Sequence, residues 1–221
     1  MQFDFTVIGD SWRYLGKGLL FTVYLWIATA VLSTFLGILL ALVRTYGPFW
    51  AKPAIAFYVD SMRAVPLLVI MVWVYFALPL VTGVNFPAFV AALIALTFQS
   101  MAYICEIARA GISSIRGGQM RAGLALGMSR SDVVRKVILP QAAVRVLPPY
   151  GSMLAAIGKN TAIASVIAVP EFMQQSTVLA AQTFRPIEIF SSAMLVYFLL
   201  IFPVTRVVDL IYRRIERLGR S

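Results

Sequence analysis

A lysine with two polar neighbours, Lys159-Asn160-Thr161, stands inside an otherwise apolar stretch of the sequence. Lys159 follows Arg145 by fourteen residues, which is about 21 Å along an α-helix at the standard rise per residue. If that helix crosses a membrane, the charge lies deep within it, where charged side chains are costly and usually functional. An ammonium group with polar neighbours could bind a substrate carboxylate through charge-assisted hydrogen bonds. A structural lysine that pairs with a backbone carbonyl, another span or a neighbouring subunit is the alternative.

Two further polar side chains, Gln99 and Ser100, interrupt a second apolar stretch. They could add polar contacts along the same substrate pathway. Amide and hydroxyl side chains in membrane spans also form ordinary hydrogen bonds between helices. Both interpretations of Gln99 and Ser100 are open from the sequence.

Opposite charges are separated by three residues in two places, at Glu106 with Arg109 and at Asp60 with Arg63. This spacing brings two side chains together on one face of a helix. We therefore expect Glu106 and Arg109 to form an ion pair that positions or gates one end of a span. The same ion pairing is predicted for Asp60 and Arg63.

The sequence contains no set of residues that would support an enzyme. It has no histidine and a single cysteine, Cys105, so a disulfide within the chain, a zinc site and a CxxC redox pair are excluded. Its carboxylates are scattered, and it has no glycine-rich loop ending in Lys-Ser or Lys-Thr that would hold ATP phosphates. We expect a non-catalytic chain that binds no metal and no cofactor of its own.

The elements that hold these residues are membrane-spanning helices. Of the 221 residues, 61% are hydrophobic and 13% are charged, whereas soluble domains carry about 25% charged residues. The pattern predicts an all-α integral membrane protein with a single domain over residues 1–221 and five spans. The predicted spans are residues 18–43, which we interpret as a retained helix and not a signal peptide, 55–80, 86–110, 146–169 and 187–212, the last bent at Pro203.

Lysine and arginine are concentrated in two connecting segments, as is typical of cytoplasmic loops. Residues 109–145 hold seven of them against Asp132 alone, and the tail after the last span holds Arg213, Arg214, Arg217 and Arg220. With five spans, this distribution predicts the N-terminus outside and the C-terminus inside. The formal net charge of +10 does not indicate nucleic-acid binding, because the basic residues lie in short segments between apolar stretches and form no face interleaved with aromatic residues.

The cytoplasmic segment of residues 112–141 is too long for a simple connection. Its apolar residues recur at spacings of three and four, which predicts two short amphipathic helices. We expect a break near residues 127–129, a helix cap at Ser129 or Ser131, and an end of the second helix at Pro140. A compact basic hairpin is typical of a docking element, although such helices can also lie flat on anionic lipid.

Residues 118–129 (GQMRAGLALGMS) and 137–142 (VILPQA) resemble the EAA loop of ABC-importer permeases. Ala122, Gly127, Leu139 and Pro140 match the motif at its spacing. The sequence departs from it at Arg121, where the family has Glu, at Gly123, where it has Ala, and at Val137, where it has Ile. The resemblance implies that this loop contacts an ATP-binding subunit through Arg121, Ala122, Gly123, Gly127, Leu139 and Pro140, with Gly127 at a position of close approach.

Three other stretches are similar to the polar amino acid branch of that family, which includes histidine, glutamine and glutamate/aspartate permeases. They are residues 106–112, residues 147–149 with 159–161, and residues 63–68, where Arg63-Ala64-Val65-Pro66 resembles the family's Arg-Gly-Thr-Pro. Arg63 is thereby a further candidate for the substrate pathway. Asn160 stands where the family commonly has Asp.

The resemblance implies a permease subunit in the bacterial cytoplasmic (inner) membrane. It implies two ATP-binding subunits that hold ATP and Mg²⁺, a second permease of the same or a related chain, and an extracytoplasmic substrate-binding protein. Because the middles of the predicted spans carry no acidic residue, an acidic or zwitterionic amino acid, or a derivative, fits better than a cationic one. The alternative is an ion-coupled secondary transporter of a small polar solute, although the sequence shows no internal repeat typical of that class.

Overall fold

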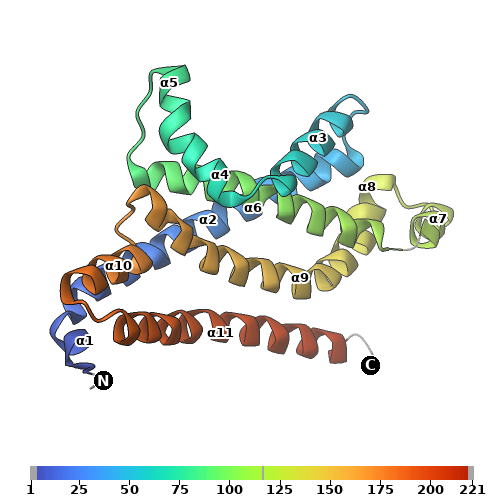
Figure 1. Ribbon diagram of the computed structural model, residues 1–221. Helices are drawn as coiled ribbons and strands as arrows, with labels where there is room; N and C mark the ends of the chain where they lie inside the picture. Colours follow the sequence, from blue (N-terminus) through green and yellow to red (C-terminus); the bar gives the residue numbers. More distant parts are fainter. Residues whose placement is uncertain (1–3, 116, 219–221) are drawn as a thin grey trace.

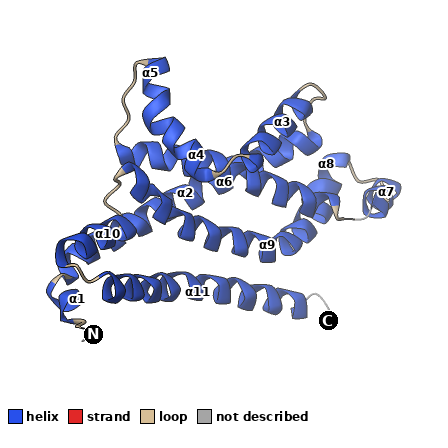
Figure 2. Cartoon of the chain, in the orientation of Figure 1, coloured by secondary structure: helices blue, strands red, loops and turns tan. Residues whose placement is uncertain are grey.

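The computed structural model describes residues 4–115 and 117–218, and within these residues the chain forms helices and no strand (Figure 2). The side chains of Arg116, Arg217 and Arg220, which contribute to the predicted orientation, lie outside the described part. The helices are α1 (Thr6–Asp10), α2 (Trp12–Tyr46), α3 (Ala51–Ala64), α4 (Leu67–Val72), α5 (Leu78–Thr82), α6 (Ala88–Ser113), α7 (Gly117–Ala125), α8 (Arg130–Val133), α9 (Leu139–Asn160), α10 (Phe172–Thr183) and α11 (Pro186–Leu218). Two π-helical turns, Trp73–Ala77 and Val134–Ile138, and a 3-10 turn, Thr161–Ile167, connect some of them.

Up to five membrane crossings follow from helix length and composition in the described chain. Three single helices are long and apolar enough to cross, namely Trp12–Tyr46, Ala88–Ser113 and Pro186–Ile215. Two bent pairs of helices pass the same test, with bends of 103° and 50°. The prediction of an all-α membrane protein with about five spans is confirmed.

The second span is not the continuous helix predicted for residues 55–80. It is broken between α3 and α4, where Val65 adopts an extended conformation (φ −92°, ψ 133°) and the chain turns by 103°. Pro66 explains the break, because the residue before a proline is driven out of the helical region. The turn separates α3, which begins beside the end of α2, from α4 and the helical segment that continues to α5 (Figure 1).

The fourth span also differs from its prediction of residues 146–169. Helical structure runs from Arg130 to Ile167, so the second helix of the loop continues into the span and does not end at Pro140. The π turn Val134–Ile138 lies directly before Pro140, and such a wide turn relieves the clash of a proline ring with the preceding helical turn. Residues 172–183, which lie between two predicted spans, form α10, and α11 continues as a helix through Pro203.

The core lies around α6, which packs against α2, α3, α4 and α9. Within the most apolar window of each helix, 61% of residues are buried in α6, against 28% in α2 and 22% in α11. Small residues such as Ala91, Ala95 and Ala102 are fully buried on α6 and allow neighbouring helices to approach closely. Helices α2 and α11 therefore leave one face for lipid or for another subunit.

A buried carboxylate, Glu171, joins three helices at the start of α10. It accepts hydrogen bonds from the backbone N–H groups of Met173 (2.8 Å) and Gln174 (2.7 Å), so it is the N-cap of that helix. It also accepts bonds from the hydroxyls of Thr22 on α2 (3.3 Å) and Tyr197 on α11 (3.0 Å). Glu171 falls between the predicted spans 146–169 and 187–212, yet it has no exposure to solvent.

Replacement Glu171→Ala is expected to lower the stability of the folded protein by about 2–3 kcal/mol, because it leaves several buried donors without an acceptor. Glu171→Gln keeps one acceptor oxygen and is expected to cost less. Thr177→Ala, on the exposed side of the same helix, is the control and should change little. Thermal unfolding in detergent measures the three variants, and equal stability of Glu171→Ala and Thr177→Ala would contradict the role of Glu171.

Candidate translocation and docking sites

Lys159 is exposed on the surface of the protomer, near the end of α9. It lines a cavity of about 320 Å³ together with Met173 of α10 and Phe190, Met194 and Tyr197 of α11. Within the described residues its ammonium group makes no hydrogen bond or ion pair. Because an unpaired charge facing hydrocarbon is costly, this side of the protomer is suited to face a polar pathway or another subunit.

The two neighbours of Lys159 are placed differently. Asn160 is half-buried, whereas Thr161 is fully buried and its hydroxyl donates to the carbonyl of Gly158 at 2.8 Å. This geometry favours a structural role for Thr161. The structure therefore keeps Lys159 and Asn160, but not Thr161, at an accessible position.

Gln99 and Ser100 are both buried on α6. The amide of Gln99 donates to the carbonyl of Val65 at 2.8 Å and approaches that of Met62 at 3.5 Å. These carbonyls lie at the end of α3, where the helix break leaves acceptors without a partner in the helix. Of the two interpretations of Gln99, the structure favours the interhelical hydrogen bond.

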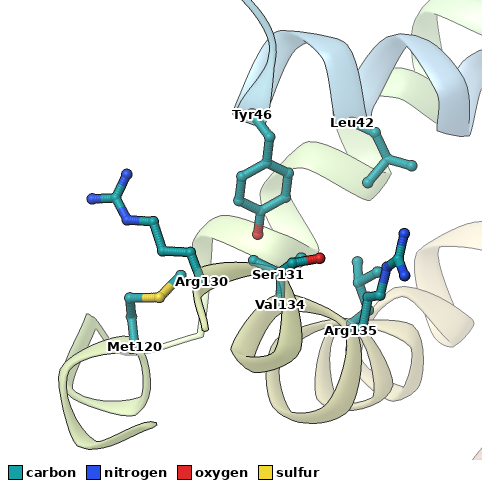
Figure 3. A pocket seen from close by; sticks show the side chains of 8 residues that line it. Leu42, Tyr46, Met120, Arg130, Ser131, Val134 and Arg135 are labelled. Carbon is teal, nitrogen blue, oxygen red and sulfur yellow. The ribbon is translucent and has the colours of Figure 1, made fainter. Parts of the chain in front are cut away.

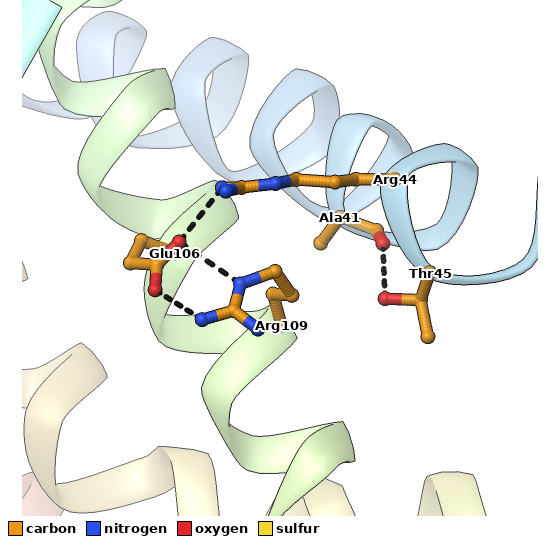
Figure 4. A network of polar contacts seen from close by, with 5 residues as sticks. All are labelled: Ala41, Arg44, Thr45, Glu106 and Arg109. Carbon is orange, nitrogen blue, oxygen red and sulfur yellow. Dashed lines mark hydrogen bonds and ion pairs between the residues drawn. The ribbon is translucent and has the colours of Figure 1, made fainter. Parts of the chain in front are cut away.

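Glu106 holds two arginines, Arg44 and Arg109, near the end of α6 (Figure 4). Its Oε2 atom accepts hydrogen bonds from Nη1 of Arg44 at 2.8 Å and from Nε of Arg109 at 3.0 Å. The ion pair expected from the spacing of Glu106 and Arg109 is present, and Arg44 extends it from α6 to α2. The sequence analysis missed Arg44, although its place at the end of the first predicted span put it at the same side of the membrane.

The predicted pairing of Asp60 with Arg63 is wrong, because no ion pair joins them within the described chain. The guanidinium of Arg63 instead lies over the ring of Tyr103, 5.6 Å from its centroid. The hydroxyl of Tyr103 in turn donates to the carbonyl of Arg63 at 3.4 Å. Arg63 is exposed at the break between α3 and α4, so it stays a candidate for the substrate pathway.

Helices α7 and α8 form a hairpin at the end of the molecule (Figure 1). Gly127 ends the first helix with φ +79°, a left-handed conformation that glycine adopts without strain. The N–H of Met128 reaches back to the carbonyl of Gly123 at 3.1 Å and closes this turn. Ser129 then caps α8, since its hydroxyl oxygen accepts from the N–H of Asp132 at 3.1 Å.

The two glycines of the hairpin differ in what surrounds them. No atom of this chain lies within 4 Å of a Cβ built on Gly127, so Gly127 makes the turn and no close approach within the protomer. A Cβ on Gly123 would lie 2.5 Å from Cγ2 of Val133, whose side chain is fully buried. Gly123 is therefore the residue that allows α7 to pack against α8.

The hairpin is anchored on one side and loosely packed on another. Its buried residue Val133 belongs to an apolar cluster with Ile112, Ile138 and Ala142 of the adjoining helices. Beside this anchor, a cavity of about 540 Å³ lies between the hairpin and the end of α2. Figure 3 shows this cavity, with Tyr46 extending from α2 toward Ser131 and with Arg130 and Arg135 beside them.

The outer surface of α7 carries two of the six residues predicted to dock, Arg121 and Ala122. Arg121 and Ala122 are exposed, as are Leu124 (41%) and Leu126 (82%). Exposed leucines on a short helix that projects from the bundle are unusual unless a partner covers them. Of the remaining candidates, Leu139 packs on the apolar anchor and Pro140 is exposed at the start of α9.

The fold defines a multi-pass helical membrane protein, and no cluster of metal-ligating side chains occurs among the residues searched. Residues 33–220 match the family described as the binding-protein-dependent transport system inner membrane component. This match covers most of the chain, and the protein belongs to that family. The prediction of an ABC-importer permease in the inner membrane is thereby confirmed, and the family assignment displaces the alternative of an ion-coupled secondary transporter.

Full-length relatives and a solved structure agree with this assignment. The chain is 36% identical over 218 residues to the glutamine transport system permease protein of Escherichia coli (strain K12), covering 98% of both. It is 32% identical over 219 residues to the arginine transport system permease protein of Bacillus subtilis (strain 168), covering 98% of this chain and 99% of the relative. A crystal structure of an amino acid ABC transporter with histidines superposes with a TM-score of 0.90 at 30% identity, over 97% of this chain and 100% of that one.

The substitution Gly123→Ala is expected to separate α7 from α8, because the added methyl group collides with Val133. Amide hydrogen exchange over residues 117–133 would then accelerate about tenfold or more, which corresponds to a loss of about 1.4 kcal/mol of local stability. Gly118→Ala is the matched control, since its added methyl group meets no atom within 4 Å. Unchanged exchange in Gly123→Ala would show that the two helices do not depend on this contact.

Proposed function

We propose that this chain is the pore-forming permease of an ATP-driven importer for amino acids, with an acidic or zwitterionic amino acid, or a derivative of one, as its substrate. The observation that carries the substrate class is the position of Lys159, a cation without an ion-pair partner among the described residues. Every amino acid offers a carboxylate that such an ammonium group can bind. The full-length relatives whose names specify glutamine and arginine transport support the broader class of amino acids.

Two acidic side chains inside the helical bundle, Glu171 and Glu106, are already engaged by other groups of the chain. Glu171 is buried and accepts four hydrogen bonds from α2, α10 and α11. Glu106 binds the guanidinium groups of both Arg44 and Arg109. Lys159 and Arg63 are exposed cations, and a cation of this kind binds a carboxylate in preference to an ammonium or guanidinium group.

The α7–α8 hairpin is proposed as the contact with the ATP-binding subunit. Its exposed surface combines Arg121 and Ala122 with the apolar side chains of Leu124 and Leu126, which suits insertion into a groove. Gly123 and Gly127 shape the hairpin, while Leu139 and Pro140 join it to the rigid start of α9. A displacement of the docked hairpin would pass through the apolar anchor to α6 and α9.

The proposed complex contains two permeases, the second being a copy of this chain or a related one, two ATP-binding subunits that hold ATP and Mg²⁺, and an extracytoplasmic binding protein. The N-terminus is proposed to lie outside and the C-terminus inside. Arg121, Arg130, Arg135 and Lys136 support this orientation, because they gather at the hairpin end of the molecule, where lysine and arginine favour the cytoplasm.

Purification of the chain from its native membrane in mild detergent, followed by mass spectrometry and reconstitution into liposomes, tests the assignment. We expect an ATP-binding subunit to copurify, and uptake of radiolabelled amino acids to require ATP and a binding protein. Competition among glutamate, glutamine and arginine then defines the substrate. ATP-independent uptake by the chain alone would overturn the proposal.

Replacement Lys159→Met is expected to lower uptake of an acidic amino acid by about tenfold or more, because it removes a charge-assisted contact worth about 1.5–3 kcal/mol. Binding of the ATP-binding subunit should not change. Lys159→Arg retains the charge and should retain part of the uptake. If both variants transport normally, Lys159 has a structural role instead.

Replacement Leu126→Asp is expected to weaken association with the ATP-binding subunit by roughly tenfold or more, since it would bury a charge in the docking groove. Leu126 is 82% exposed, so the isolated chain should fold and insert as before. Gln141→Asp, exposed in the first turn of α9, is the control. Normal association of Leu126→Asp, measured by copurification, would exclude the hairpin as the docking surface.

A further inference from the structure

Three basic side chains from three helices meet in one cavity at the hairpin end of the bundle. Arg44 of α2, Lys52 of α3 and Arg109 of α6 line a space of about 450 Å³. The hydroxyl-bearing residues Thr45 and Ser113 also line it. The cavity lies outside the predicted substrate pathway and outside the docking surface of α7.

The cavity is positively charged, and two of its three basic side chains are already held in place. The carboxylate of Glu106 offsets one positive charge and accepts hydrogen bonds from both arginines. The donors are Nη1 of Arg44 and Nε and Nη2 of Arg109. A guanidinium group has five N–H donors, so each arginine keeps donors for a ligand. Lys52 is exposed and makes no ion pair within the described chain. The three cations outnumber the carboxylates of Glu106 and nearby Asp60, which leaves a net positive site for an anion. Arginines that are already fixed lose little entropy on binding it.

Exposed aromatic rings indicate the depth of this cavity in the membrane. Phe49 and Trp50, in the connection just before Lys52, are 85% and 69% exposed. Aromatic side chains, tryptophan and tyrosine above all, concentrate at the level of the lipid headgroups. Phe57, one and a half turns further along α3, is 77% exposed and continues an apolar surface toward the membrane interior. The basic cavity thus lies at headgroup depth, with an apolar surface leading away from it.

We propose that this cavity binds the phosphate headgroup of an anionic phospholipid. The phosphate oxygens would accept charge-assisted hydrogen bonds from Arg44, Lys52 and Arg109, and the acyl chains would lie along α3. A zwitterionic lipid brings its own cationic group to a site that already holds three, so it binds less well. The lipid bridges α2, α3 and α6 and holds the start of the broken second span against the core. This inference does not depend on the substrate proposed above.

Native mass spectrometry of the intact transporter complex, released from nanodiscs of equal phosphatidylglycerol and phosphatidylcholine, tests the site. We expect phosphatidylglycerol to be retained on the wild-type permease under conditions that remove phosphatidylcholine. Lys52→Gln should lower this retention about fivefold, the factor that corresponds to about 1 kcal/mol per basic residue near anionic lipid. Ala56→Leu, which narrows the cavity without changing its charge, should also lower it.

Lys136→Gln is the matched control, because Lys136 is a basic residue at the same end of the molecule that does not line the cavity. Equal retention of the two lipids, or an equal effect of Lys52→Gln and Lys136→Gln, would overturn the proposal. A further experiment distinguishes a lipid ligand from a soluble anion: inorganic phosphate is added to complexes that contain phosphatidylcholine alone. Thermal stabilisation by phosphate equal to that by phosphatidylglycerol would also overturn the lipid assignment.

Discussion

Water is absent from the hydrocarbon core of a bilayer, so each polar group there must find a partner within the protein. Most of the internal geometry of this permease follows from that constraint. The break at Pro66 frees carbonyl groups, and Gln99 on α6 supplies the donor for that of Val65. The indole N–H of Trp26 donates to the carbonyl of Leu154 at 2.8 Å and joins α2 to α9. Glu171 accepts hydrogen bonds from three helices, and these bonds offset the cost of burying a carboxylate inside the bundle.

Lys159 differs from these bonded residues. Its charge is exposed on the protomer and unpaired within the described chain, whereas the carboxylates Glu106 and Glu171 are fully engaged. A surface of this kind is stable only where water, a substrate or another subunit meets it. The lightly buried faces of α2 and α11 likewise require lipid or a partner. The isolated protomer is therefore one part of an assembly, as its family membership also indicates.

Some features of the hairpin follow from the local sequence, and others depend on how its helices pack. Ser129 is recognisable as a helix cap, and a break near Gly127 follows from the run Gly-Met-Ser. The close approach at Gly123 could not be predicted, because it depends on where Val133 lies once α8 continues into α9. The continuation itself depends on a π turn that accommodates Pro140, and proline in a sequence normally indicates the end of a helix. The missed contact of Arg44 with Glu106 has the same origin, since it joins helices distant in the chain.

The sequence by itself determined the all-α membrane class, the approximate spans, the family and the pairing of Glu106 with Arg109. These properties rest on hydropathy, residue spacing and short motifs, which are local along the chain. Only the tertiary structure decided that the second span breaks at Pro66, that α10 replaces a predicted loop, and that Arg63 lies on Tyr103 and not beside Asp60. It also decided which polar residues are engaged, with Thr161 and Gln99 bonded to backbone carbonyls and Lys159 left accessible. The reason is physical: a polar group in a membrane protein takes its partner from whichever helix packs against it, and helix packing is a property of the whole chain.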